Sequence, residues 1–191
     1  ELAGGMGYRQ PNATFTGPGI NPWNTEAWSG GSSSGSGSAV GAGCVPFAIG
    51  SETMGSILGP AGNCGISGYR PTYGRVSRRG AMALSWTLDK LGPMCRTADD
   101  CGLVLDAIAG PDPNEPTTLD APFHYRPDRD RSAGFRLGVL REGMDDAQPE
   151  VRDNFERSID ELSRIATLEE VSLPDYPYAQ TTELIIRAEG T

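Results

Sequence analysis

The sequence is poor in histidine and lysine, two side chains that act as general bases in enzymes. Its 191 residues include one histidine, His124, and a single lysine, Lys90, among sixteen basic residues. His124 lies in a Pro-bounded segment far along the chain from the serine-rich stretches, and we interpret it as a surface or loop residue. A Ser-His-Asp triad would depend entirely on this one histidine.

Positive charge and paired cysteine motifs are lacking as well. A formal net charge of −9 and a pI near 4.6 disfavour nucleic acid as a direct ligand, because phosphate binding needs clustered Lys and Arg. The four cysteines show no CxxC spacing and no neighbouring histidine, so we expect neither a metal site nor a thioredoxin-like redox site. We expect buried free thiols at Cys44, Cys64, Cys95 and Cys101.

Long apolar runs are also missing. No stretch approaches about 18 uninterrupted apolar residues, so the sequence predicts no membrane-spanning helix. A signal peptide is not recognised either, and we expect a cytoplasmic protein.

Glycine and proline, by contrast, are abundant, with 26 and 15 copies, while the hydrophobic share of 37% is typical of a folded soluble domain. We expect one loop-rich domain over residues 1–191. Residues 4–38 predict irregular backbone, and the large side chains of Phe15, Trp23 and Trp28 favour an ordered active-site loop over a flexible linker.

The rest of the chain alternates between helical and strand patterns. We expect strands at 45–49, 66–69, 135–140 and 168–173, and helices beginning near 35, 56, 97, 149 and 178. Such alternation predicts an α/β fold with a mixed β-sheet core covered by helices on both faces. The helix that begins at Pro149 carries an apolar stripe that we expect to pack against a core.

Two clusters of glycine and serine, at 30–37 and 53–57, are the main candidates for chemistry. A serine flanked by glycines where a loop enters a helix lies beside backbone N–H groups that have no partner within the helix. Such groups can stabilise an oxyanion, although turns collect the same residue types for purely structural reasons.

These clusters belong to a longer series of motifs. Gly30-Gly31-Ser32-Ser33 is followed by Gly50-Ser51-Glu52-Thr53-Met54-Gly55-Ser56-Ile57, Pro71-Thr72-Tyr73-Gly74-Arg75-Val76-Ser77-Arg78, Leu88-Asp89-Lys90-Leu91-Gly92-Pro93 and Arg96-Thr97-Ala98-Asp99-Asp100. In this series the chain resembles the amidase-signature family, most strongly over about residues 20 to 120.

The resemblance implies a Ser-Ser-Lys mechanism. Ser56 corresponds to the nucleophile and Ser32, after a cis peptide bond from Gly31, to the serine that relays protons to a lysine. The backbone N–H groups of Thr53, Met54, Gly55 and Ser56 correspond to the oxyanion hole. The family's lysine precedes the relay serine, and residues 1–31 contain none. We therefore expect an incomplete amidase domain, without its lysine-bearing N-terminal part and its C-terminal part, that is inactive alone.

The resemblance also leaves alternatives. Met54 stands where the family most often has glycine, and Leu58 where many members have arginine. Leu58 favours an amidase acting on a small-molecule amide, with a homodimer as one option for its assembly, over the glutamine-hydrolysing component of a tRNA amidotransferase with its partner subunits. An inactive scaffold on the same fold is a further alternative. The run at 35–41 resembles a dinucleotide fingerprint, but its spacing is wrong by one residue.

Overall fold

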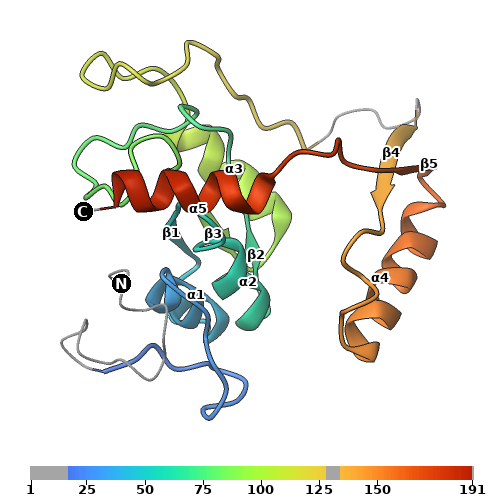
Figure 1. Ribbon diagram of the computed structural model, residues 1–191. Helices are drawn as coiled ribbons and strands as arrows, with labels where there is room; N and C mark the ends of the chain where they lie inside the picture. The colour runs from blue at the N-terminus through green and yellow to red at the C-terminus, as the bar shows by residue number, and fades with distance from the viewer. Residues whose placement is uncertain (1–16, 128–133, 191) are drawn as a thin grey trace. The chain divides into compact units, whose positions relative to one another are not determined.

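The chain forms two compact units, residues 1–125 with 181–191 and residues 126–180. A computed structural model describes residues 17–127 and 134–190 (Figure 1). The first unit holds α1 (Ser34–Gly41), β1 (Phe47–Glu52), α2 (Leu58–Asn63), β2 (Ser67–Gly68), β3 (Lys90–Cys95), α3 (Ala98–Ile108) and most of α5 (Tyr178–Glu189). The second holds β4 (Phe135–Leu140), α4 (Pro149–Leu162) and β5 (Ala166–Val171). The expectation of one domain over 1–191 stays a prediction.

The sheet of the first unit has β3 at its centre, antiparallel to both β1 and β2. Successive residues of a strand face opposite sides of the sheet. Met94 joins a buried cluster with Ile57 and Ala61 near α2, while the thiol of the next residue, Cys95, contacts Cys101 of α3. Helices thus cover both faces of β3, which confirms the expected α/β fold.

The sequence pattern did not predict β3, because a proline within a strand argues against a central position. Two local features explain it. Pro93 lies opposite Ile49 of β1, and its carbonyl accepts a hydrogen bond from the backbone N–H of Tyr69 at 2.9 Å. Pro93 therefore lies opposite Tyr69, the residue that follows the two-residue β2. The hydrogen bond that proline cannot donate would fall just beyond the end of that strand. At Gly92 the chain passes so closely that a Cβ would overlap the carbonyl oxygen of Tyr69.

Several other predicted elements are confirmed. The Thr97 hydroxyl caps α3 by accepting a hydrogen bond from the backbone N–H of Asp100 at 3.1 Å. α1, β4, α4 and α5 form where the pattern indicated. β1 begins later than expected and continues to Glu52, through part of the predicted loop, because its pairing with β3 extends that far. Among the described helices, none is long and apolar enough to cross a membrane.

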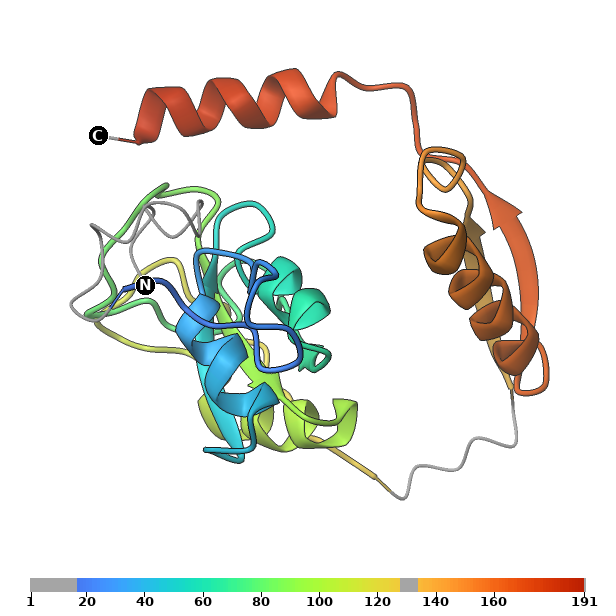
Figure 2. The same cartoon turned by 90° about the horizontal axis from the view of Figure 1, so that it is seen from below.

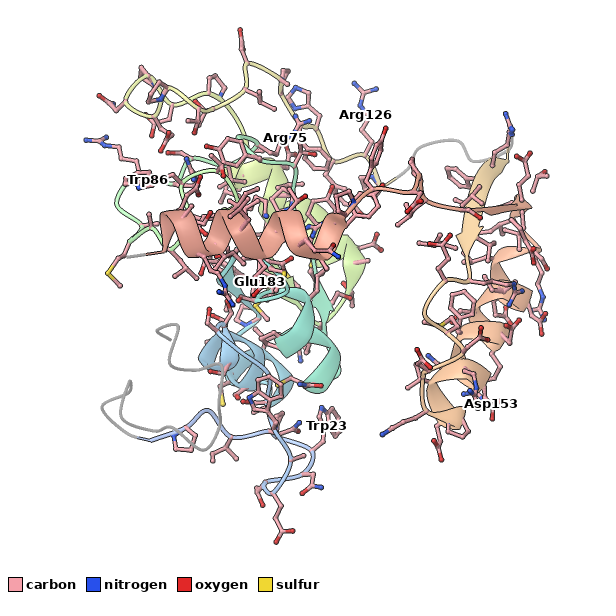
Figure 3. The ribbon with its side chains drawn as sticks, in the orientation of Figure 1. Trp23, Arg75, Trp86, Arg126, Asp153 and Glu183 are labelled. Carbon is pink, nitrogen blue, oxygen red and sulfur yellow. The ribbon has the colours of Figure 1, made fainter. Side chains whose placement is uncertain are left out.

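The segment before α1 is ordered by hydrogen bonds rather than by buried aromatic rings. The Asn21 amide donates to the carbonyl oxygens of Trp28 and Asn63, at 3.2 and 2.8 Å. The Trp23 indole, labelled in Figure 3, donates to the carbonyl of Cys64 at 2.8 Å, yet Trp23 is 72% exposed. Phe15 lies outside the described residues.

The second unit is a parallel pair of strands, β4 and β5, with Phe135 opposite Ala166. α4 runs beside them in both views (Figures 1 and 2). Its helix was predicted, but its expected packing against a core was not found, since no residue of α4 is buried and Val151 is 49% exposed. Phe155 and Ile159 of the stripe are partly buried and Val139 of β4 is 7% exposed, so the described residues of this unit cover the stripe only in part.

Candidate active site

The fold brings the two serine clusters together. The backbone N–H of Ser33 donates to the carbonyl oxygen of Ser56 at 3.2 Å. The peptide bond between Gly31 and Ser32 is cis, as the resemblance implied. Gly30 has a positive φ of 80°, and a Cβ there would lie 2.6 Å from the backbone of Pro60 in α2. Only glycine permits this close approach of the first cluster to the helix that follows Ser56.

The serines of the first cluster differ in their bonding. The Ser33 hydroxyl donates to the carbonyl of Ser51 at 3.2 Å and accepts from its N–H at 3.1 Å, so it fastens the cluster to β1. The hydroxyls of Ser32 and Ser56 are half-buried and form no hydrogen bond with the residues that the structure describes. Ser32 and Ser56 are therefore available for chemistry, whereas Ser33 has a structural task.

The turn from β1 into α2 presents backbone donors. The N–H groups of Met54, Gly55 and Ser56 meet no acceptor within residues 17–127 and 134–190. Gly55 has a φ of 91°, a left-handed conformation that glycine adopts freely, and a Cβ placed on it would meet open space. The side chain of Met54, within the same turn, is 64% exposed. Adjacent free N–H groups beside a serine are the arrangement that stabilises an oxyanion.

The next two N–H groups along the turn are occupied by a buried carboxylate. Glu52, whose side chain is 0% exposed, accepts hydrogen bonds from the backbone N–H groups of Ile57 and Leu58 at 2.9 and 3.0 Å. Its other oxygen lies 3.4 Å from Nη1 of Arg70. Glu52 thereby links the end of β1 to the two residues that follow Ser56. Sequence reasoning missed this role, although an acidic residue inside an otherwise small and neutral motif was a usable signal.

The Glu52 carboxylate is expected to be important for stability. Glu52→Ala leaves the buried N–H of Ile57 and the partly buried N–H of Leu58 without an acceptor and removes the partner of Arg70, so the free energy of unfolding should fall by about 3 kcal/mol. Glu52→Gln retains an oxygen acceptor and should lose less. Urea denaturation of both variants measures this, with exposed Glu26→Ala as the control. Equal midpoints for Glu52→Ala and the parent protein would contradict the assignment.

Lys90 and Asp89 contact the same turn from the start of β3. Lys90 Nζ donates to the carbonyl of Thr53 at 3.2 Å, and the Thr53 hydroxyl donates to Oδ1 of Asp89 at 2.5 Å. Burial and the positive charge of Arg70 lower the pKa of Lys90, against smaller opposing effects of Glu52 and Asp89. The contact of Lys90 with the predicted oxyanion loop was not foreseen from the sequence.

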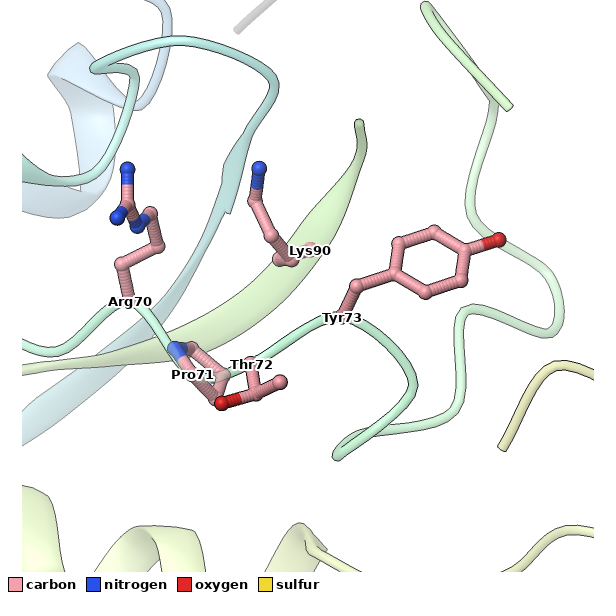
Figure 4. Close-up of a pocket in the computed structure, with 5 residues that line it drawn as sticks. All are labelled: Arg70, Pro71, Thr72, Tyr73 and Lys90. Atoms are coloured by element: carbon pink, nitrogen blue, oxygen red, sulfur yellow. The ribbon is translucent and has the colours of Figure 1, made fainter. Parts of the chain in front are cut away.

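A cavity of about 360 Å³ adjoins Lys90 and is lined by Arg70, Pro71, Thr72, Tyr73 and Lys90 (Figure 4). The side chains of Arg70 and Lys90 point to the same side of the 70–73 segment. The pocket is therefore polar at the edge that adjoins the serine-bearing turn.

The alternative nucleophiles and bases are placed elsewhere. His124 is an exposed residue whose Nδ1 lies 3.7 Å from Oδ1 of Asp106 in α3, and no contact joins it to either serine cluster among the described residues. Burial raises the pKa of Cys64 and Cys101 and that of Cys95 to about 12, which keeps these thiols protonated and unreactive. The expected burial of free thiols holds for these three, whereas Cys44 is exposed.

Comparison with known proteins supports the resemblance. The family model described as Amidase matches residues 3–190. The glutamyl-tRNA(Gln) amidotransferase A component of Deinococcus radiodurans is 44% identical over 169 residues, which cover 87% of this chain and 35% of that protein. The crystal structure of the same component from Thermotoga maritima has a TM-score of 0.82 at 37% identity, over 88% of this chain and 38% of that one.

A peptide amidase is also similar. The structure of the native enzyme from Stenotrophomonas maltophilia has a TM-score of 0.77 at 34% identity, over 97% of this chain and 38% of that one. The chain thus spans little more than a third of the length of these relatives. Because the family model covers almost all of its residues, the chain belongs to the amidase family, whose members carry the amidase signature.

Proposed function

We propose that the protein carrying this chain hydrolyses carbon–nitrogen amide bonds through an acyl-enzyme on Ser56. The observation that supports this most directly is the hydrogen bond from Ser33 to Ser56, which holds the two serine clusters together beside a turn with free N–H groups. Ser56 is the proposed nucleophile, and Ser32 the proposed proton relay. Membership of the amidase family supports the same chemistry.

The proposed reaction proceeds in two halves. Ser56 Oγ attacks the amide carbon while its proton passes through Ser32 to a base, and the carbonyl oxygen becomes an oxyanion held by N–H groups of Thr53, Met54, Gly55 and Ser56. The carbon–nitrogen bond then breaks as the proton returns to the leaving nitrogen. Water cleaves the ester by the same path in reverse, which releases the carboxylate and restores Ser56.

The base in this proposal is not Lys90. Its Nζ is engaged with the carbonyl of Thr53, and it follows the nucleophile in sequence, whereas the lysine implied by the family precedes Ser32. The mechanism therefore requires a lysine from outside these 191 residues. It uses no metal or other cofactor, since two serines, a lysine and backbone donors supply every proton transfer and the charge stabilisation.

A second candidate function is that of the glutamine-hydrolysing component of a tRNA amidotransferase. The similarity to the amidotransferase components from Deinococcus radiodurans and Thermotoga maritima favours it. In that case we propose the other amidotransferase subunits as partners, and otherwise a small-molecule amide as substrate and a homodimer as the assembly. We propose a cytoplasmic location for either.

Ammonia release from the full protein that carries the chain tests both functions. The panel contains simple aliphatic amides, peptide amides and glutamine, the last with and without the partner subunits and a glutamylated tRNA. Turnover of amides by the protein alone, unchanged after EDTA treatment, is the expected result. Turnover of glutamine only in the presence of partner subunits would favour the second function, and no turnover of any amide would overturn both.

A further inference from the structure

We propose that Lys90 and Asp89 are positioning residues that aim the backbone N–H of Met54 at the oxyanion. This inference rests on the proposed function, because it assigns to the described contacts a task in amide hydrolysis. Neither side chain is proposed to touch the reacting atoms.

The two residues hold Thr53 at two points. Lys90 Nζ binds its carbonyl oxygen at 3.2 Å, and Asp89 Oδ1 binds its hydroxyl at 2.5 Å. The Thr53 carbonyl makes one contact and the Thr53 hydroxyl makes the other. Rotation about the φ or ψ angle of Thr53 would therefore break at least one of them. The residue that precedes Met54 is therefore fixed in orientation.

The planarity of the peptide unit transmits this orientation to Met54. Within the described residues the only cis peptide bond is Gly31–Ser32, so the bond between Thr53 and Met54 is trans. In a trans peptide the C=O and N–H bonds point in opposite directions. Because Lys90 fixes the direction of the Thr53 carbonyl, it also fixes that of the Met54 N–H, which points away from the lysine and meets no acceptor among the described residues.

The anchors are themselves held in place. Oδ2 of Asp89 accepts hydrogen bonds from the backbone N–H groups of Leu84 and Ser85 at 2.7 and 3.0 Å. Lys90 is the first residue of β3 and pairs with Glu52 of β1, one residue before Thr53. A donor that is oriented before the substrate arrives stabilises an oxyanion without the cost of reorganisation.

The test compares Lys90→Met, which keeps the length of the side chain but removes its donor, with Lys90→Arg, which retains a donor. Exposed Arg96→Met is the matched control for the lost positive charge. The measurements, made on the full protein, are kcat, KM and the affinity for a substrate-like aldehyde, which forms a tetrahedral adduct with the nucleophile and so uses the oxyanion donors.

Lys90→Met should lower kcat by about 10- to 100-fold and lower the affinity for the aldehyde by a similar factor. Loss of one oxyanion donor lowers kcat by about 10²- to 10³-fold, and a donor that is present but misdirected should have a smaller effect. KM should change little, and Lys90→Arg and Arg96→Met should resemble the parent. Thr53→Val has nearly the same shape but no hydroxyl to bind Asp89, so it should lower both kcat and the affinity for the aldehyde. This variant tests the positioning role if Lys90→Met fails to fold.

Unchanged kcat and aldehyde affinity in the folded Lys90→Met or Thr53→Val protein would overturn the positioning role while the amidase function stands. A fall in kcat without a loss of aldehyde affinity would overturn it as well. If the parent protein neither hydrolyses an amide nor forms the aldehyde adduct, both the function and the positioning role fail.

Discussion

Replacement of Ser56 by alanine in the full protein is expected to lower kcat for amide hydrolysis by about 10⁶-fold. The reason is that Ser56 is proposed to supply the oxygen that bonds to the acyl carbon, at a turn where no second serine or cysteine follows Gly55 directly. Cys64, Cys95 and Cys101 are buried with raised pKa values. Steady-state kinetics and covalent labelling by a fluorophosphonate measure the effect, and the label should disappear together with the activity.

Ser51→Ala is the matched control for this experiment. Ser51 is an exposed serine in the same motif, and the hydrogen bonds that it makes with Ser33 involve its backbone, which the substitution retains. Its variant should keep both turnover and labelling. Persistent labelling in Ser56→Ala would show that another residue is the nucleophile.

Replacement of Ser32 by alanine is expected to lower kcat by about 10²- to 10⁴-fold, the range that a positioned proton-transfer group contributes. Substrate binding should persist, because Ser32 is proposed to move a proton rather than to hold the substrate. The measurements are kcat, KM and the rate at which a fluorophosphonate labels Ser56, and this rate should fall with kcat.

Comparison of Ser33→Ala with Ser32→Ala distinguishes a structural serine from a proton relay. It removes the hydroxyl that bonds both to the carbonyl and to the N–H of Ser51, so it should lower the melting temperature. Ser32→Ala, whose hydroxyl has no partner among the described residues, should not. Full activity in Ser32→Ala would refute the relay assignment and direct attention to Ser33 and Ser34.

Features that depend on neighbouring residues were predictable from the sequence. The capped start of α3 at Thr97 follows from a side chain that reaches an N–H three residues away. The glycine- and serine-rich clusters at 30–37 and 53–57 stood out in the sequence, whereas the choice of Ser32 and Ser56 within them and the cis peptide bond before Ser32 followed from the resemblance. Each of these signals is contained within a few consecutive positions.

Features that depend on distant residues were not predictable. The contacts of Thr53 with Asp89 and Lys90 join positions 36 and 37 residues apart, and no periodic pattern announces them. The local preference of Pro93 argued against a strand that the packing nonetheless requires. The stripe on α4 predicted the helix correctly but not its environment, because periodicity reports which face is apolar and not what covers it.

Gly92 and Pro93 also protect β3 against a shift of its pairing register. A slip of β3 by one position would turn every side chain to the opposite face of the sheet and carry Lys90 away from Thr53. It would also place either Leu91 or Pro93 beneath the carbonyl of Tyr69, where a Cβ does not fit. Side chains introduced at Gly92 should therefore impair catalysis from a site that touches neither serine.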